Sequence, residues 1–298
     1  LGMTEELSFS FTSEKTLDKL GVPADSPLRQ AIPIMNPLTD EYPLIRTTLL
    51  TSVFENAARN VARKNMDLRL FDIAPVFFPK ALPVTELANE KLMVAGLITG
   101  RRSPIAWDTD NAQVDFYDMK GILERFLTAI GVQKYTVERG EHFAMHPGKT
   151  AFFKKGRDVI ATLGEIHPTV AANFGIAQSV YVFEMEVDTL LRYRKKKNTI
   201  ASLPKYPAST RDLAILVDAD LSTAEIERVI AKKGGKFFRG ATLFDVYMGK
   251  QVGSGKKSMA FHLHFQSDDK TLTDEEVDAA FADILAAAQS QLHAELRA

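Results

Sequence analysis

Cysteine is absent from the 298 residues, and tryptophan occurs once. Without thiols, disulfide bonds and thiolate metal sites are excluded, and any nucleophile must be a hydroxyl, an amine or a carboxylate. The longest apolar runs are far shorter than the roughly 20 residues that span a bilayer, and the first residues lack a basic start followed by an apolar stretch. We therefore expect a cytoplasmic protein with no membrane partner.

An excess of charge of either sign is also lacking, because 37 lysines and arginines stand against 38 aspartates and glutamates. If nucleic acid is a partner, a local patch must bind it. The hydrophobic content of 45% suffices for one large core or for two cores of unequal size. A strand pattern starts almost directly after Leu1, which suggests a fragment of something longer.

Signatures of common active sites are missing as well. The glycine-rich stretch 249–257 lies between two expected strands, so it does not lead into a helix as a phosphate-binding loop does. No Gly-x-Ser-x-Gly nucleophile elbow occurs. His142 and His146 have the spacing of a zinc-binding helix, but Pro147 and Gly148 follow and no acid comes directly after His142. We therefore expect neither a metal site nor a hydrolase.

The first 190 residues predict one α+β domain. A strand is expected around 7–11, and four prolines between positions 23 and 37 forbid a continuous helix there. Apolar residues then recur at steps of three and four, which indicates a helix packed on the core: Leu50, Phe54, Ala57 and Val61. The other expected elements are a helix at 117–130 and strands at 68–78, 92–98, 135–138, 151–153, 159–163 and 180–187.

A basic connector separates this domain from a second one. The stretch 192–205 holds lysines and arginines but no acid. Pro204 and Pro207 mark its end. Such a run cannot bury itself. We therefore divide the chain into a domain of residues 1–195, a basic linker of 196–204 and a domain of 205–298. Clustered lysines can contact phosphate, although such runs are more commonly only solvated.

The second domain predicts a ferredoxin-like βαββαβ order. Two Ser/Thr-x-x-Glu capping boxes, at Ser222 and Thr273, open its two helices. Strands are expected at 213–217, 242–247, 258–266 and 295–297, with a glycine-rich hairpin between the second and third. Two helices cover one face of such a sheet, and the open face is where these domains commonly bind something.

The motifs of this second domain closely resemble the ferredoxin-fold anticodon-binding domain of phenylalanyl-tRNA synthetases. The matching stretches are Tyr206-Pro207-Ala208, Arg211-Asp212-Leu213, Phe244-Asp245-Val246-Tyr247, Gly255-Lys256-Lys257-Ser258, Thr271-Leu272-Thr273-Asp274-Glu275-Glu276 and Glu295-Leu296-Arg297. The first domain resembles the catalytic-like module of the bacterial-type β chain of these enzymes, so the two domains together resemble the C-terminal portion of that β chain. The stretches there are Ser8-Phe9-Ser10-Phe11, Asn36-Pro37-Leu38, Arg46-Thr47-Thr48-Leu49-Leu50, Leu70-Phe71-Asp72-Ile73 and Gly164-Glu165-Ile166-His167-Pro168.

The resemblance implies a class II synthetase-like antiparallel module that does not catalyse. Active class II sites need an arginine and an acid two residues apart on one strand face. Here Arg69 is followed by its nearest acid, Asp72, three residues on and on the opposite face. In the family the α chain holds the active site, in an assembly of two α and two β chains that uses ATP and magnesium. We therefore expect no catalytic residue and no cofactor in this chain.

Three functions remain open at this point. The leading hypothesis is a non-catalytic β-chain portion of phenylalanine-tRNA ligase, which assembles with the α chain and binds the anticodon region of tRNA(Phe). A self-sufficient adenylate-forming enzyme would instead show ATP- and phenylalanine-dependent pyrophosphate exchange on its own. A pure interaction scaffold would fail to bind tRNA(Phe) through residues 205–298.

A subunit interface is expected in the first domain. The stretch 36–50 resembles the class II dimerisation motif, in which an extended strand leads into a long helix. We therefore expect four residues of this region to contact another subunit: Asn36, Pro37, Arg46 and Arg59. The apolar stripe of the helix is equally compatible with a role in the core alone.

An RNA-binding surface is expected on the open face of the second domain. Strand alternation assigns Met259, Phe261, Leu263 and Phe265 to the core and Ala260, His262, His264 and Gln266 to the open face. On the neighbouring strand, Phe244 and Val246 are the expected core pair, with Leu243, Asp245 and Tyr247 outside. Tyr247, His262 and His264 would stack bases, Asp245 would accept from base amino groups, and Arg211, Lys256 and Lys257 would reach phosphates. Exposed sheet faces also carry tyrosine and histidine for β propensity alone.

Overall fold

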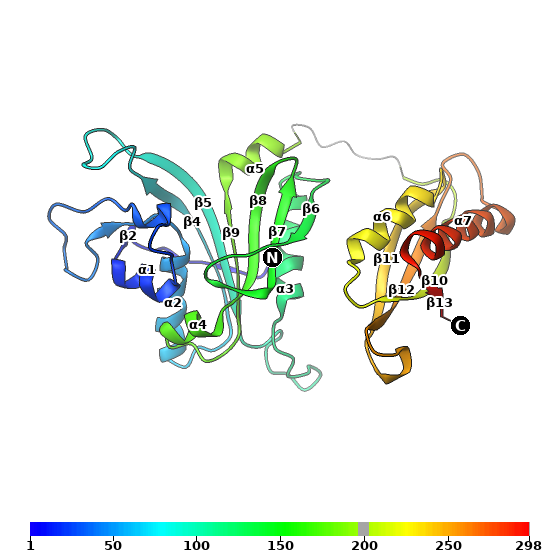
Figure 1. Cartoon of the computed structure of the whole chain (residues 1–298), viewed down its shortest axis with the longest axis horizontal. Helices are drawn as coiled ribbons and strands as arrows, with labels where there is room; N and C mark the ends of the chain where they lie inside the picture. The colour runs from blue at the N-terminus through cyan, green and yellow to red at the C-terminus, as the bar shows by residue number, and fades with distance from the viewer. Residues whose placement is uncertain (196–202, 298) are drawn as a thin grey trace. The chain divides into compact units, whose positions relative to one another are not determined.

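The chain folds into two units, Leu1–Asn198 and Thr199–Ala298. Figure 1 shows the computed structural model, which describes residues 1–195 and 203–297. Most of the expected basic linker, residues 196–202, lies outside the described residues. Within the described ranges, no helix combines the length and the apolar character needed to cross a membrane.

The first unit is built around a seven-stranded sheet in the order β1-β4-β5-β9-β8-β7-β6. Its strands pair antiparallel, except that β1 pairs parallel with β4. A separate two-stranded sheet joins β2 to β3. The strands are β1 Thr4–Glu5, β2 Phe11–Thr12, β3 Leu44–Ile45, β4 Leu68–Phe78, β5 Asn89–Thr99, β6 Thr136–Arg139, β7 Met145–Lys155, β8 Asp158–Ile166 and β9 Val180–Glu186.

Helices cover both faces of this sheet (Figure 1). They are α1 Glu14–Leu20, α2 Leu50–Ala62, α3 Phe116–Ala129, α4 Pro168–Asn173 and α5 Val187–Tyr193, with a short 3-10 turn at Pro27–Arg29. Strand β5 shows how one apolar run serves two cores. Its Ala95 and Leu97 pack with α1, α2 and α4, whereas Val94 and Ile98 pack with α3 and α5. Successive side chains point to opposite faces of a strand, so a continuous apolar run is buried on both sides.

Most elements of the first unit agree with the sequence pattern, and the α+β class is confirmed. The helix expected from Leu50 is α2, and the apolar runs at 68–78 and 92–98 are the strands β4 and β5. The strand expected at 7–11 is wrong except at Phe11, because pairing is confined to β1, which precedes it, and to β2, which begins at its last residue. Helices α1, α4 and α5 were not expected, because they have only six or seven residues, too few for a clear period.

Helix α2 begins without a side-chain cap of its own, because the preceding residue is Leu49. The cap comes from Glu184 in β9, whose carboxylate accepts from the Leu49 N–H at 2.9 Å and from Thr48 Oγ1 at 2.7 Å. Burial raises the pKa of Glu184 despite these donors. A distant strand thus satisfies the free N–H groups at the start of the helix.

The second unit has the expected ferredoxin-like βαββαβ order, which is confirmed. Its elements are β10 Ser209–Asp218, α6 Thr223–Lys233, β11 Phe238–Tyr247, β12 Lys256–Phe265, α7 Asp274–Leu292 and β13 Glu295–Leu296, with a 3-10 turn at Lys250–Val252 inside the hairpin. The sheet order is β11-β12-β10-β13. Both predicted capping boxes are formed, at Ser222 with Glu225 and at Thr273 with Glu276. Helices α6 and α7 close the core on one face of this sheet.

Candidate nucleic-acid interface and subunit surface

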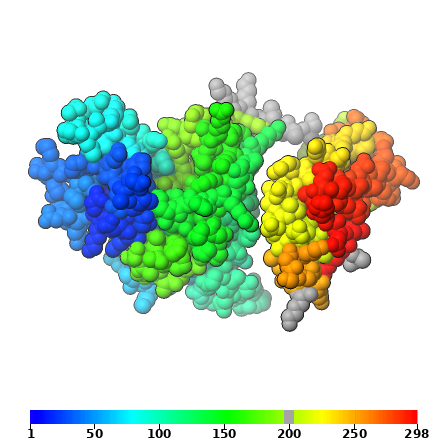
Figure 2. All heavy atoms as spheres, viewed as in Figure 1, coloured from blue at the N-terminus to red at the C-terminus, as the bar shows by residue number. Residues whose placement is uncertain are grey.

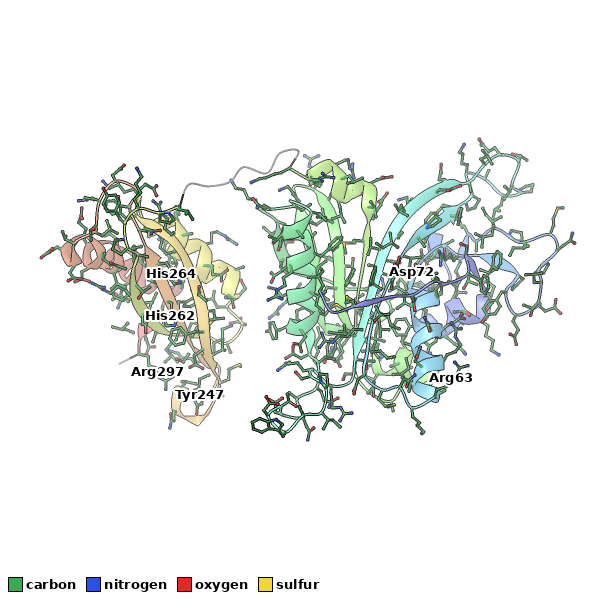
Figure 3. All side chains as sticks on the ribbon, turned by 180° about the vertical axis from the view of Figure 1, so that it is seen from behind. Arg63, Asp72, Tyr247, His262, His264 and Arg297 are labelled. Atoms are coloured by element: carbon green, nitrogen blue, oxygen red, sulfur yellow. The ribbon has the colours of Figure 1, made fainter. Side chains whose placement is uncertain are left out.

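Strand β12 divides its side chains between the two faces of the second sheet. Met259, Phe261, Leu263 and Phe265 are buried in the core with α6 and α7, as alternation predicts. His262 and His264 lie on the opposite, open face. Figure 3 shows His264, His262 and Tyr247 in succession along the sheet, with Arg297 near Tyr247. The structure therefore brings together three of the residues expected to bind RNA.

Strand β11 departs from alternation at a bulge. Leu243 pairs with Phe261, but the next paired residue, Asp245, faces Ala260, so Phe244 is an extra residue between them. The expected core role of Phe244 is wrong, because its side chain is 50% exposed. Leu243, expected outside, instead packs against the core. After the bulge, Asp245 and Tyr247 lie on the open face, as expected, and pair with the open-face residues Ala260 and Ser258.

Val246 was expected to be the second core residue of β11. It pairs with Met259, a core residue, yet its side chain is 48% exposed. The expected burial of Val246 is therefore wrong, although its position in the row is on the core side. The strand extends here beyond the part of the sheet that the helices cover.

Phe244 forms an aromatic pair that the sequence pattern did not reveal. Its ring stacks on His262 with centroids 4.0 Å apart and planes inclined by 14°. His262 Nδ1 lies 2.6 Å from Asp212 Oδ1 on β10. Beside it, His264 Nε2 lies 3.2 Å from Thr242 Oγ1. Each imidazole is thus held by a neighbour on an adjacent strand, which leaves the Phe244 ring as the outer aromatic surface.

Tyr247 and Arg297 cover the end of the open face. The Arg297 guanidinium lies 5.6 Å from the centroid of the Tyr247 ring. Its Nη1 donates to Ser258 Oγ at 2.9 Å. Ser258 is only 2% exposed, although α6 and α7 pack on the opposite face of the sheet. Sequence reasoning matched Arg297 to a family motif but gave it no role at the site.

The three basic residues expected to reach phosphates are not on one surface. Arg211 pairs with the core residue Leu263 and binds Asp274 and Asp278 of α7 at 2.8 and 2.9 Å, which places it on the helix side. Lys257 is also in the core-facing row, and its Nζ donates to the Leu221 carbonyl at 2.5 Å. Lys256 belongs to the open-face row, at the edge where it meets Glu295.

The open face carries little net charge. The Glu295 carboxylate raises the pKa of the Lys256 amine, so Lys256 stays a cation but a paired one. Asp212 likewise stands beside His262. Exposed aromatic rings with paired charges suit the stacking of bases better than the gathering of phosphates.

Arg46 in the first unit is an internal residue. Its guanidinium donates to Ser8 Oγ at 2.7 Å and to the Pro75 carbonyl at 3.0 Å, and it lies 3.6 Å from Asp72. The expectation that Arg46 contacts another subunit is wrong, because its side chain is 1% exposed. Burial lowers the pKa of Arg46, although the Asp72 carboxylate opposes that shift. Sequence alone gives no sign of this, because arginine is seldom fully buried.

The other three expected interface residues lie at the surface. Asn36 and Arg59 are exposed and Pro37 is half-buried. Four large apolar side chains among the first 40 residues are at least 82% exposed: Leu7, Phe9, Met35 and Leu38. The segments that carry them flank the same strand, because Arg46 N–H donates to the Ser10 carbonyl while Ile34 N–H donates to the Pro43 carbonyl. Figure 2 shows the segments of residues 1–50, in blue, on the surface of the first unit. Met35 and Leu38 lie on one loop, whereas Leu7 and Phe9 lie on the segment at the other side of β3. Exposed apolar groups on a surface mark candidate interaction sites.

Arg69 and Asp72, the residues compared with active class II sites, make contacts within the chain. The Arg69 guanidinium donates to the Arg102 carbonyl at 2.6 Å, and Asp72 is buried on the other strand face. A cavity of about 360 Å³ between α3 and α5 has mainly apolar walls. In residues 1–195 and 203–297, no three His, Cys, Asp or Glu side chains are grouped to hold a metal ion.

Family comparisons agree with both halves of this architecture. The family model described as "Phenylalanyl tRNA synthetase beta chain CLM domain" matches residues 1–187. The chain belongs to the phenylalanyl-tRNA synthetase β chain family. A second model, the "Ferredoxin-fold anticodon binding domain", matches residues 204–297. The resemblance predicted from the sequence motifs is therefore confirmed.

Relatives among curated proteins carry the same family name. The chain is 39% identical to the phenylalanine–tRNA ligase beta subunit of Syntrophotalea carbinolica, over 99% of this chain and 37% of that protein. It is 38% identical to the beta subunit of Clostridium acetobutylicum (99% and 36%) and 36% identical to that of Geobacter sulfurreducens (99% and 37%). The chain thus spans little more than a third of the length of these relatives.

Among solved structures, the chain is similar to a pyrrolysyl-tRNA synthetase from Desulfitobacterium hafniense. The TM-score is 0.48 and the sequence identity 14%, over 64% of this chain and 62% of that one. That likeness is too low to carry an argument.

Proposed function

We propose that this chain is a non-catalytic part of a phenylalanine–tRNA ligase, in which the second unit binds the anticodon region of tRNA(Phe) and the first unit assembles with the α chain. RNA binding is supported by the open sheet face. There Phe244 and Tyr247 expose aromatic rings, beside the hydrogen-bonded imidazoles of His262 and His264. The family match of residues 204–297 supports the same role.

Base stacking is the binding mode that this face favours. Aromatic rings accept any base, and the acceptor Asp245 on the same face can bind the amino groups that some bases carry. Lys256 supplies one cation at the edge for a phosphate. Arg211 and Lys257 are not part of this surface, because both lie on the helix side.

Removing either exposed ring tests the stacking. Phe244→Ala and Tyr247→Ala are each expected to weaken the binding of tRNA(Phe) by about 1–3 kcal/mol, with an almost unchanged salt dependence. Val246→Ala is the matched control, because Val246 is equally exposed on the same strand but belongs to the core-side row. Filter binding at several salt concentrations measures both quantities. Wild-type affinity of both ring variants for tRNA(Phe) would exclude the stacking surface.

Assembly with an α chain is proposed for the apolar surface around Met35 and Leu38. Apolar anchors at the centre of an interface commonly contribute most of its binding free energy. Leu38→Asp is therefore expected to weaken the complex with an α chain at least about tenfold. Arg59→Glu, on the exposed side of α2, should weaken it as well while the helical content stays the same.

The measurement is the mass of the complex after the chain is mixed with an α chain of a related ligase. Ile105→Asp is the control, because Ile105 is 73% exposed but lies in the loop between β5 and α3. An unchanged complex with Leu38→Asp and Arg59→Glu would place the α-chain surface elsewhere. In this proposal ATP and magnesium bind to the α chain, and the present chain supplies no catalytic residue.

A self-sufficient adenylate-forming enzyme is the weaker alternative. The Arg69 guanidinium donates to the Arg102 carbonyl, and the acid nearest to it in the sequence, Asp72, is buried on the opposite strand face. Pyrophosphate exchange by the isolated chain remains the test that separates the two. A scaffold without RNA binding is separated by the tRNA titration above.

A further inference from the structure

Arg297 crosses the open face of the second unit. Its backbone follows the edge strand β13, where its N–H donates to the Ala214 carbonyl of β10 at 3.0 Å. Its side chain reaches Ser258 of β12 and the Tyr247 ring of β11. The sheet order β11-β12-β10-β13 means that this one side chain spans from one edge strand to the other. Figure 3 shows Arg297 and Tyr247 at the same end of the sheet.

Gly249 limits the Tyr247 ring from another side. A Cβ at Gly249 would lie 2.5 Å from Tyr247 Cζ and closer still to the phenolic oxygen. The φ angle of Gly249 is −154°, an extended conformation that any residue adopts. Backbone strain therefore does not require glycine here. The missing side chain instead makes room for the phenol.

We infer that Arg297 and Gly249 are positioning residues that hold the Tyr247 ring ready to stack an RNA base, an inference that rests on the proposed RNA-binding function. A ring at the end of a sheet edge would otherwise change rotamer freely, and ordering it on binding would cost affinity. Arg297 opposes this motion because a guanidinium over an aromatic face is attracted to it. The guanidinium is itself fixed by Ser258, which is 2% exposed.

The alternative role of Arg297 is a direct contact with a phosphate. The two roles differ in their salt dependence, because a phosphate contact releases counterions whereas a stacked base does not. They also differ in how they depend on Tyr247. A residue that acts only through the ring loses its effect once the ring is removed, which a double-mutant cycle measures.

The experiment uses the full chain and two RNA probes, a tRNA(Phe) transcript and the same transcript without its anticodon stem-loop. Arg297→Met and Gly249→Ala are each expected to weaken the binding of the normal transcript by about 2- to 12-fold at an unchanged salt slope, the cost of ordering one side chain. Neither substitution should weaken binding further in a Tyr247→Ala chain. Ser290→Ala, on the exposed side of α7, is the control for a general loss of stability.

A second readout needs no RNA. Nuclear magnetic relaxation of the Tyr247 ring carbons should show lower order in Arg297→Met, and a changed ring environment in Gly249→Ala, while the amide spectrum of the core stays the same. If both variants leave the ring as in the wild type, the positioning role is overturned. A salt slope reduced by about one in Arg297→Met, with its effect retained after Tyr247→Ala, would overturn it in favour of a phosphate contact.

Failure of the proposed RNA binding would give other results than failure of the positioning role. The wild-type chain would then bind both transcripts equally or not at all, whatever the ring does. Ordered ring carbons in the wild type and disordered ones in Arg297→Met would still establish the positioning contact, and the ligand would have to be sought elsewhere.

Discussion

Replacing Arg46 by methionine is expected to destabilise the first unit by about 3–5 kcal/mol, because it leaves the Asp72 carboxylate buried without its cation. Asp72 is 3% exposed, and its other partner, Ser8, is a neutral hydroxyl that donates at 2.5 Å. Methionine keeps much of the length and apolar stem of arginine, so the loss reports on the charge and its hydrogen bonds. Urea unfolding followed by circular dichroism measures the change.

Two further variants separate charge from packing. Arg59→Met removes an exposed arginine from the same region and should change stability by less than about 0.5 kcal/mol. Arg46→Met combined with Asp72→Asn should recover part of the loss, because the uncompensated charge is then gone. A single Arg46→Met chain as stable as the wild type would show that the buried pair contributes nothing to the fold.

The second large effect is expected at Glu6, whose stability contribution should depend on pH. Glu6 is 5% exposed, and its Oε1 has no hydrogen-bond partner in the described part of the chain. Burial, with a smaller contribution from the Asp72 charge, raises the pKa of Glu6 from 4.5 to about 7. Asn56 donates to the other carboxylate oxygen and only partly offsets this.

Because the pKa of Glu6 is raised in the folded chain, the folded chain binds the proton more tightly than the unfolded chain does. Between pH 4.5 and about 7 the folded chain keeps the Glu6 proton while the unfolded chain has released it. The free energy of unfolding therefore falls as the pH rises through this window, by up to about 3 kcal/mol, and stays low above it. Glu6→Gln carries no titrating proton and should lose this dependence.

The test compares Glu6→Gln with the wild type by urea unfolding at pH 5 and at pH 8. The difference between the two proteins should shift by about 2–3 kcal/mol in favour of the variant at the higher pH. The change in this difference between pH 5 and pH 8 is a better test than the difference at one pH. A glutamine N–H₂ group at the Oε1 position also lacks a partner, and this cost is the same at both pH values. Glu5→Gln removes the same charge from an exposed neighbour. Equal pH slopes for the wild type and Glu6→Gln would contradict the prediction.

Both predictions concern one buried polar cluster under the N-terminal segment. Arg46, Asp72 and Glu6 lie where β1 joins β4 and where the chain continues toward the exposed side chains Leu7 and Phe9. The cluster has two carboxyls but a single buried arginine. Arg46 donates to Ser8 and Asp72 accepts from Ser8, so loss of the charge pair should also disturb the exposed segment of Leu7 and Phe9.

The fold class of the second unit and the order of its elements follow from local sequence signals. Strand β12 alternates regularly, both helices open with capping boxes, and glycine ends the first helix, so local signals agree with one another. The long apolar strands β4 and β5 and the helix α2 were predictable for the same reason. Family motifs then indicated the β chain, because they occur in order along nearly the whole chain.

Tertiary structure alone decided which side chains the site presents. The bulge in β11 places Phe244 outside and Leu243 inside, and no alternation rule predicts an extra residue in one strand. Arg211 and Lys257 lie on the helix side because their partners, Asp274, Asp278 and the Leu221 carbonyl, come from distant parts of the chain. Arg46 is buried because Ser8 and Asp72 meet it there. A sequence shows which groups are charged or aromatic, but only packing brings together the partners that hold them, because those partners are far apart along the chain.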